Sequence, residues 1–385
     1  MKKKIFVLVM IVVMFANVGF ANADENDAKG LFAFSVEQKA TLLGTENVKF
    51  LKNNEISIEE VEMPSVVQKK YAEYGMSVNG AYKDIVASIK RDAETYGLSK
   101  EQIKNYIKAS LATVPIIEDN RNKNVVVSSE NSSTRAVNRP LDDGIGWEVM
   151  SLSKYSGATT FVTLPTIQNR TSNTAAYMFY TIDTTDVFNN VIDFCMDFGV
   201  GYDVGGDGVA RWRIFQVRND PYFVSSQHMY EPFKDIYIDT NRLYFRVEHL
   251  QQNPGFMSFK IVDGTNFDRV FVDYHFYVGS YGIYDTNTSF NKQVTLCNTN
   301  HNYLTGTRLL NAAFSDSYIY STPNQITSRM LPAHCEDGEY IGANTYELDR
   351  CGAFGTNSTN ARQVIKNSGN NWYEENISIY FQQMP

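Results

Sequence analysis

The sequence predicts a mainly β protein, in which a two-sheet antiparallel β-sandwich of the jelly-roll type follows a small helical region. After residue 144 the chain alternates short runs of β-branched and aromatic residues with turn signals such as Asn253-Pro254-Gly255 and Asp263-Gly264. Helical periodicity is missing from this part of the sequence, whereas it recurs before residue 115. Many short strands separated by turns are typical of two stacked antiparallel sheets.

The first 23 residues predict a cleavable secretory signal peptide. Lys2-Lys3-Lys4 precedes an apolar run over residues 5–15, and Ala21-Asn22-Ala23 provides a small-residue cleavage site. The apolar run is shorter than the roughly 20 residues that span a bilayer. We therefore expect a secreted, extracellular protein whose mature chain has no membrane span.

Residues 24–115 predict a helical N-terminal region. Apolar residues recur at helical spacing from Ile85 to Ala93, and Gly97 follows as a left-handed stop. Ser99-Lys100-Glu101-Gln102 matches a capping box that opens the next helix, and an earlier helix is expected at residues 64–74. A pro-region, a docking module, a cap over the second domain and a small stabilising appendage are all compatible with this region.

Residues 116–140 predict a polar linker, because tracts such as Asp119-Asn120-Arg121-Asn122-Lys123-Asn124 bury too little apolar area to offset chain entropy. The predicted β-sandwich domain spans residues 141–385. Its expected strands lie at residues 159–164, 176–183, 191–198, 209–217, 242–250, 257–262, 269–278, 318–320 and 377–381.

Charge and cysteine content narrow the partners and cofactors. The net charge of −8 argues against nucleic acid as a partner, since nucleic acid demands a basic surface. No Cys-x-x-Cys spacing occurs, so the sequence does not support a zinc ribbon or thioredoxin-like chemistry. Export permits disulfides, and Cys335 with Cys351 is the first candidate pair because it closes a short loop; free buried thiols are the alternative. We expect no cofactor: Asp203-Val204-Gly205-Gly206-Asp207-Gly208 is compatible with calcium but lacks the later Glu of an EF-hand loop.

Alternation along three expected strands separates apolar sets from polar sets, which we expect to face solvent or a groove. One polar set is Asp193, Cys195 and Asp197. The other two are Arg242, Tyr244, Arg246 and Glu248, and then Arg269, Phe271, Asp273, His275 and Tyr277.

These outward sets predict a carbohydrate-binding surface. Aromatic rings stack on sugar faces, while carboxylates and guanidinium groups bond to hydroxyls. The predicted ligand-binding residues are Asp193, Asp197, Tyr244, Glu248 and Tyr277. Asp193 and Asp197 stand about 13 Å apart on one strand, too far for a glycosidase pair, and a solvated polar face explains the pattern as well.

The domain opening Gly146-Trp147-Glu148-Val149 and the runs Thr163-Leu164-Pro165-Thr166-Ile167 and Val191-Ile192-Asp193-Phe194 resemble the YrpD-like secreted proteins of Gram-positive bacteria. That family has no established activity. The resemblance covers the last two thirds of the chain and implies a secreted β protein.

More broadly, the domain resembles the concanavalin-type jelly roll of lectins, glucanases and some polysaccharide lyases. Phe276-Tyr277-Val278-Gly279-Ser280-Tyr281 is similar to the Phe-Lys-Ala-Gly-x-Tyr strand of jelly-roll alginate lyases. That resemblance implies a proton-transferring role for Tyr281, although Tyr277 replaces the lysine of the lyase strand. The Gln-Ile-His motif and the arginine-rich first strand of the lyases are absent. His275 and Arg246 are our own candidates for those roles and match no motif of the family.

The leading expectation is a secreted β-sandwich protein that binds cell-wall or environmental carbohydrate. The alternative is a carbohydrate-active enzyme, with β-elimination before glycoside hydrolysis. A surface-adhesion protein that self-associates through its helical region is the third.

Overall fold

The structure is a computed structural model of the 385-residue chain. It describes residues 35–121, 144–152, 155–184, 194–204, 208–219, 233, 235–281, 283, 288–298, 300, 302–321, 328–330, 335–336, 339–340, 348–355, 361–369 and 372–381. The chain divides into two units, Met1–Ser35 and Val36–Pro385, and the second holds every helix and strand described below. The predicted signal peptide lies outside the described residues.

Four α-helices and a short 3-10 helix open the compact unit. They are α2 (Val36–Asn53), η1 (Ile58–Glu60), α3 (Ser65–Glu73), α4 (Val78–Tyr96) and α5 (Lys100–Ala112). The predicted stop and capping box are confirmed: Gly97 adopts the left-handed conformation after α4, and Ser99 and Gln102 cap α5 reciprocally.

Two large sheets follow the helices, and the fold-class prediction of a two-sheet β-sandwich is confirmed. The first, sheet A, has the path β1-β11-β10-β9-β3-β13-β19-β18, with β4 and β14 paired to β13. Its strands are β1 (Ile116–Glu118), β3 (Gly157–Thr163), β4 (Thr166–Gln168), β9 (Arg242–His249), β10 (Phe256–Asp263), β11 (Val270–Tyr277), β13 (Arg308–Tyr320), β14 (Ser328–Arg329), β18 (Ala361–Gly369) and β19 (Trp372–Tyr380).

The second sheet, sheet B, has the order β17-β2-β12-β5-β6-β7-β8. Its strands are β2 (Gly144–Ser151), β5 (Thr174–Thr184), β6 (Cys195–Val204), β7 (Ala210–Asn219), β8 (Tyr237–Ile238), β12 (Thr288–Asn298) and β17 (Leu348–Gly355). A separate small sheet pairs β15 (Cys335–Glu336) with β16 (Glu339–Tyr340), and η2 (Gly279–Tyr281) follows β11.

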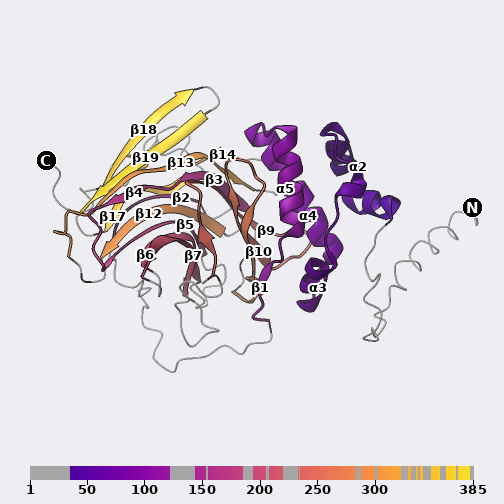
Figure 1. The fold of residues 1–385 in the computed structure, drawn as a ribbon, viewed down its shortest axis with the longest axis horizontal. Helices are drawn as coiled ribbons and strands as arrows, with labels where there is room; N and C mark the ends of the chain where they lie inside the picture. Colours follow the sequence, from indigo (N-terminus) through magenta and orange to yellow (C-terminus); the bar gives the residue numbers. More distant parts are fainter. Residues whose placement is uncertain are drawn as a thin grey trace, which may run out of the picture. The chain divides into compact units, whose positions relative to one another are not determined.

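The core of the sandwich lies between the two sheets. It contains the apolar set predicted for β9, namely Leu243, Phe245 and Val247, together with Phe194 and Phe198 from sheet B. In Figure 1 the strands of sheet B arch, and their concave side faces away from sheet A. Its outward side chains are therefore separated from the core by the sheet itself.

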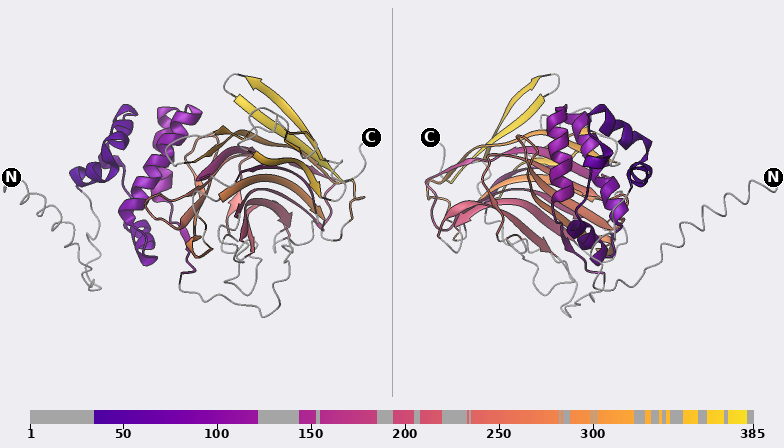
Figure 2. Two further views of the ribbon diagram at one scale, coloured as in Figure 1. Left: turned by 180° about the vertical axis from the view of Figure 1, so that it is seen from behind. Right: turned by 45° about the vertical axis from the view of Figure 1, so that its right-hand side comes forward.

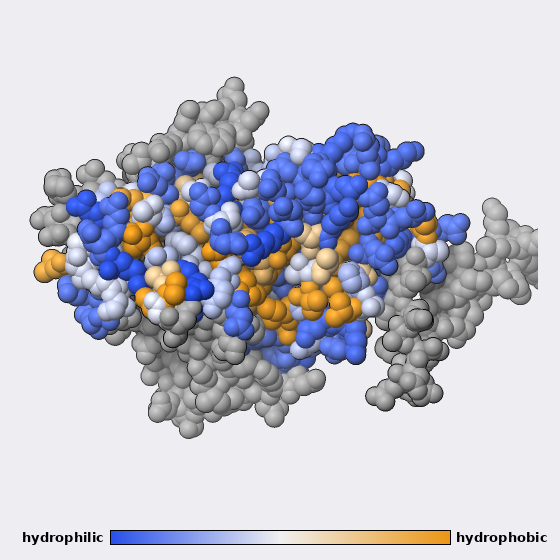
Figure 3. All heavy atoms as spheres, in the orientation of Figure 1, coloured by the Kyte–Doolittle hydropathy of each residue, from blue (hydrophilic) through white to orange (hydrophobic). Residues whose placement is uncertain are grey.

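The helices form a third layer on the outer face of sheet A, as the right-hand view of Figure 2 shows for α4 and α5. A second hydrophobic cluster joins helix residues such as Ile89 and Tyr106 to Phe161, Tyr244 and Phe267 of the sheet side. Figure 3 shows a mostly hydrophilic outer surface over α2 and α5. The layer therefore acts as a cover over sheet A, one of the options that the sequence left open.

One segment expected in the linker belongs to the fold. Residues 116–118 form β1, which pairs in parallel with β11, while the other strand pairs of the described residues are antiparallel. Ile117 is buried there between the helices and the sheet. The rest of the predicted linker from residue 122 onward lies outside the described residues. No helix in the described part of the chain is long and apolar enough to cross a bilayer.

Candidate functional site

The polar face predicted on β9 and β11 is not open to solvent, so that expectation is wrong. Tyr244, Arg246, Glu248 and His275 are all 3% exposed or less, because α4, α5 and Tyr71 of α3 cover them. Alternation along β9 placed these side chains on the correct face of the sheet. It gave no information about the helical layer that packs against that face.

Four of the covered side chains form a closed ring of alternating charge. Arg91 contacts Glu248 at 2.9 Å and Asp92 at 3.0 Å, and Arg246 contacts the same two carboxylates at 3.0 Å each. Ser88, Tyr106 and Tyr320 donate further hydrogen bonds to the two carboxylates. Buried charges are tolerated only when they are paired and hydrogen-bonded, and this ring satisfies that condition.

The neighbouring charges follow the same pattern. Although burial acts to raise it, the attraction of Arg246 and Arg91 lowers the pKa of Glu248 to about 2. Asp273 lies 2.8 Å from Lys260 Nζ and 2.8 Å from His275 Nε2. Although burial acts to raise it, the attraction of Lys260 and the contact with His275 hold the pKa of Asp273 well below the usual range. The ion pairs from Arg91 to Glu248 and from Asp92 to Arg246 attach α4 to β9.

Two of the three residues considered for a lyase, Arg246 and His275, are buried beneath the helices. Arg246 belongs to the charge ring, and His275 lies against the edge of the Tyr71 ring with centroids 5.4 Å apart. The backbone of Tyr281 lies in η2, and its side chain is outside the described residues. Elimination at this place would require a substrate to enter beneath the helices.

The other predicted ligand residues are scattered. Tyr277 is half-buried at the end of β11, where its ring packs on Phe256 and beneath Arg121. Asp193 lies outside the described residues, and Asp197 lies on the outward face of sheet B. The structure therefore does not bring Asp197 together with Tyr244, Glu248 and Tyr277, which all lie on the side of sheet A.

The predicted disulfide stays a prediction. Cys335 and Cys351 lie in β15 and β17, and their side chains are outside the described residues. Cys195 and Cys297 lie opposite positions of β5 that are eight residues apart, which separates them by about 26 Å. A disulfide between these two is excluded. The described residues contain no cluster of three or more acidic, His or Cys side chains able to hold a metal.

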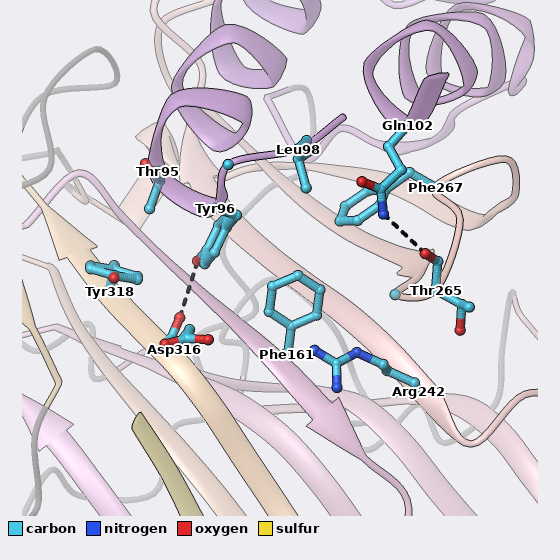
Figure 4. Close-up of a pocket in the computed structure, with 12 residues that line it drawn as sticks. Thr95, Tyr96, Leu98, Gln102, Phe161, Arg242, Thr265, Phe267, Asp316 and Tyr318 are labelled. Carbon is cyan, nitrogen blue, oxygen red and sulfur yellow. Dashed lines mark hydrogen bonds between the residues drawn. The ribbon is translucent and has the colours of Figure 1, made fainter. Parts of the chain in front are cut away.

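A pocket opens where the turn between α4 and α5 meets the edge of the covered face, and we name it the corner pocket. Its volume is about 370 Å³, within the range of small-ligand sites, ~300–1,000 Å³. It is lined by Thr95, Tyr96, Gly97, Leu98, Gln102, Phe161, Arg242, Gly264, Thr265, Phe267, Asp316 and Tyr318. Figure 4 shows Asp316 and Tyr318 on one side, Arg242 and Thr265 on the other, and Phe161 between them.

Aromatic rings form the inner wall of the corner pocket. Tyr96 meets Phe161 and Tyr318 edge to face, with centroids 5.1 and 5.5 Å away. The Tyr96 hydroxyl donates to the backbone carbonyl of Asp316 at 3.2 Å, and it also hydrogen-bonds Thr159. These contacts hold the rings in fixed positions, so the pocket is preformed.

Polar groups stand at both ends of this wall. The Arg242 guanidinium lies 4.7 Å from the centroid of the Phe161 ring, and the described residues include no acidic partner for it. Asp316 has a positive φ of 48° at a bulge of β13, where pairing with β3 shifts between Ser315 and Tyr318. Bulges re-aim side chains, and Asp tolerates the left-handed region better than most residues.

A second polar constellation crosses the concave face of sheet B, and we name it the polar ladder: Glu148, Asn291, Gln293, Thr181 and Asp197. Asn291 donates to Glu148 at 2.6 Å, Gln293 donates to Thr181 at 3.1 Å, and Thr181 donates to Asp197 at 2.6 Å. The ladder runs from β2 across β12 and β5 to β6. Glu148 and Asp197 are three strand spacings, roughly 14 Å, apart, too far for a glycosidase pair.

Aromatic side chains adjoin the polar ladder. Phe215 of β7 lies 4.9 Å from Tyr177 and 5.5 Å from Phe179, both of β5. Gly199 of β6 separates the two strands, and a Cβ there would lie 2.5 Å from the Cβ of Phe179. The glycine therefore lets the rings of β5 and β7 meet over β6.

Several of these residues escaped the sequence analysis. Glu148 appeared only within a family motif, and Asn291 and Gln293 lie in β12, a strand that was not expected. The run from Phe290 to Leu296 has apolar residues at every second position except Lys292, and this incomplete alternation is the signal that the sequence offered for the strand. The corner pocket had no such signal in the sequence, because its lining residues come from five segments that are far apart in the chain.

Comparisons with known proteins add little. No family model matches the chain, and no curated protein matches it. Among solved structures, scytalido-glutamic peptidase with a transition state analog inhibitor is 13% identical, with a TM-score of 0.32, over 61% of this chain and 98% of that chain. SCP-B, a member of the eqolisin family of peptidases in complex with the tripeptide Ala-Ile-His, is 14% identical with a TM-score of 0.31 over the same shares.

The β-porphyranase of the human gut bacterium Bacteroides plebeius is 11% identical with a TM-score of 0.17, over 38% of this chain and 53% of that chain. At such TM-scores these likenesses do not bear on the activity of this chain. Any function of the candidate sites must therefore be argued from the geometry of their residues.

Proposed function

We propose that the protein is secreted and binds extracellular carbohydrate in the corner pocket. The observation that carries the proposal is the combination of a preformed aromatic wall with Arg242 at one end and Asp316 at the other, in an open cavity of about 370 Å³. Rings pack against the C–H faces of a sugar, and guanidinium and carboxyl groups bond to its hydroxyls. The sequence led to the same expectation for the polar set of residues 242–250, which includes Arg242.

Binding is proposed in preference to catalysis. Asp316 carries the only carboxyl group among the lining residues described, and glycoside hydrolysis uses two carboxyl groups flanking the bond. Elimination is disfavoured because Arg246 and His275 are held beneath the helices. We therefore expect retention of a sugar without product formation.

The test is a glycan array followed by titration calorimetry on the full mature chain. Arg242→Ala is expected to weaken the best glycan by roughly tenfold or more, since about 1.4 kcal/mol corresponds to tenfold. Arg269→Ala is the matched control: this arginine also lies over a phenylalanine ring, pairs with Asp239 in an exposed position and does not line the pocket. An unchanged affinity in Arg242→Ala, or an array without any hit while extended peptides bind, would refute the proposal.

A further inference from the structure

A lysine interrupts the apolar stripe of β12 that faces the core of the sandwich. Phe290, Val294 and Leu296 belong to the core, and Lys292 shares their face of the strand with a side chain that is 0% exposed. Its Nζ contacts a carboxylate oxygen of Glu375, which is equally buried. Lys292 lies in sheet B and Glu375 lies in β19 of sheet A, so this contact joins the two sheets through the core.

A plain ion pair is an unfavourable way to make this connection. Removing two charges from water carries a large desolvation penalty, and apolar side chains of similar volume are often as stable or more stable in such a place. Burial lowers the pKa of Lys292, and burial raises the pKa of Glu375 despite the attraction of the lysine. Both shifts favour the neutral forms, so the core holds an amine against a carboxylic acid.

Two acceptors orient the amine of Lys292. Its Nζ donates to Ser317 Oγ at 2.8 Å and to the backbone carbonyl of Met330 at 3.4 Å. A neutral amine has two N–H groups and one lone pair, so these two acceptors engage both N–H groups and leave the lone pair directed at the carboxyl group. The Ser317 hydroxyl is itself held by a hydrogen bond with Thr160 Oγ1 at 2.7 Å.

We propose that Lys292 and Glu375 join covalently in the folded protein, through an amide bond between Nζ and the side-chain carboxyl carbon. The lone pair of Nζ attacks that carbon in the protonated carboxyl group, so that a C–N bond forms and a C–O bond breaks. One proton passes from Nζ through Ser317 Oγ to the departing hydroxyl, which leaves as water. Nothing is oxidised or reduced, and no other reactant is consumed.

The folded core favours this reaction. A lysine that is removed from water is an activated nucleophile, and two groups held in the reacting geometry behave as if their concentration were roughly 10⁵–10⁸ M. Phe314 closes the site, because it pairs with Glu375 across the strands and its ring lies 5.5 Å from Lys292 Nζ. This phenylalanine is 1% exposed, so the water that is released leaves the core and hydrolysis of the amide is slow.

A second buried lysine and carboxylate lack these conditions. Lys260 Nζ lies 2.8 Å from Asp273, which also contacts His275. Although burial acts to raise the pKa of Asp273, Lys260 and His275 hold it well below its usual range. The carboxylate therefore stays ionised, and an ionised carboxylate is a poor target for an amine. We expect no bond between Lys260 and Asp273, so the two pairs differ within one protein.

The test is the mass of the full mature chain, measured after unfolding and reduction so that disulfides do not contribute. The wild-type protein is expected to be lighter than its amino-acid sequence by the mass of one water molecule. Proteolysis is expected to yield a branched peptide that contains Lys292 and Glu375. Purified, folded protein with the full mass of its sequence would overturn the proposal, and so would a branch between Lys260 and Asp273 in place of this one.

Lys292→Met combined with Glu375→Met is the matched control. It replaces both partners by apolar side chains of similar volume, which buried ion pairs often tolerate, and it is expected to keep the full mass of its sequence. A loss of water that persists in this variant would come from another reaction, such as ring closure at Asp263-Gly264, and would refute the assignment. The wild-type mass decides the question even if the variant does not fold, and neither result depends on the Arg242 test of the corner pocket.

Discussion

His249 shows how burial alone sets the behaviour of a single titratable side chain. It lies at the end of β9, 7% exposed, with Nε2 hydrogen-bonded to Thr288 Oγ1 at 2.9 Å. Burial lowers the pKa of His249 to about 3. The folded protein thus keeps this imidazole neutral under conditions in which the unfolded chain, with a pKa of about 6.5, takes up a proton.

The sign of the pH effect follows from this difference. The contribution of His249 to stability is complete above pH ~6.5 and is lost as the pH falls toward 3, by about 2 kcal/mol at pH 5. We predict that urea unfolding at pH 7 and pH 5 will show a larger loss in the wild-type protein than in His249→Gln, which does not titrate. Equal losses in the two proteins would show that the imidazole is protonated in the folded state.

At the scale of elements, α4 is joined to β9 by the charge ring. Arg91→Met is predicted to cost about 3–5 kcal/mol, because it removes one cation from beside the buried carboxylates of Asp92 and Glu248. Lys90→Met is the control on the same helix, since Lys90 pairs with Glu94 at the surface, where the two side chains are 27% and 60% exposed. Urea unfolding of both variants checks this, and a similar small change in each would mean that the ring contributes little.

The sequence predicted individual strands and helices better than it predicted which elements pack against them. Alternation assigned Leu243, Phe245 and Val247 to the core correctly, because β9 pairs regularly on both sides. On β11 the same alternation assigned Val270 to the core and Phe271 to the outward face, which is the reverse of what the structure shows. A bulge lets Ile261 and Val262 pair with Val272 and Val270, so Phe271 turns into the sandwich core and Val270 faces the helices. The alternation of apolar and polar residues does not show where a bulge occurs.

Two charged residues in the sequence of α4 indicate that this helix packs against a charged partner. Arg91 and Asp92 lie between Ile89 and Ala93, within the apolar stripe of α4, where a solvent-facing charge is not expected. A charged pair on a buried helix face requires opposite charges on the element that it packs against. Arg246 and Glu248 meet this requirement, yet nothing local in the sequence shows which strand the helix meets.

At the scale of the whole molecule, the helices and the sandwich share one compact unit, Val36–Pro385, and one mixed hydrophobic cluster. The three tryptophans, Trp147, Trp212 and Trp372, all lie in strands, whereas the α-helices end at Ala112. We predict that tryptophan fluorescence and the helical circular dichroism signal will give the same midpoint in urea. Loss of the helical signal at clearly lower urea would show instead that the helices are an independent appendage.

The ring between α4 and β9 also affects how the chain is made. Arg91 and Glu248 are 157 positions apart, and Asp92 and Arg246 are 154 positions apart. At synthesis rates of about 5–20 residues per second, α4 leaves the ribosome on the order of ten seconds before its partner strand. During that interval its charged face remains hydrated and its apolar stripe has nothing to pack on. The first helices made are therefore among the last elements to reach their final contacts, and a chaperone that acts early on the nascent chain will meet them uncovered.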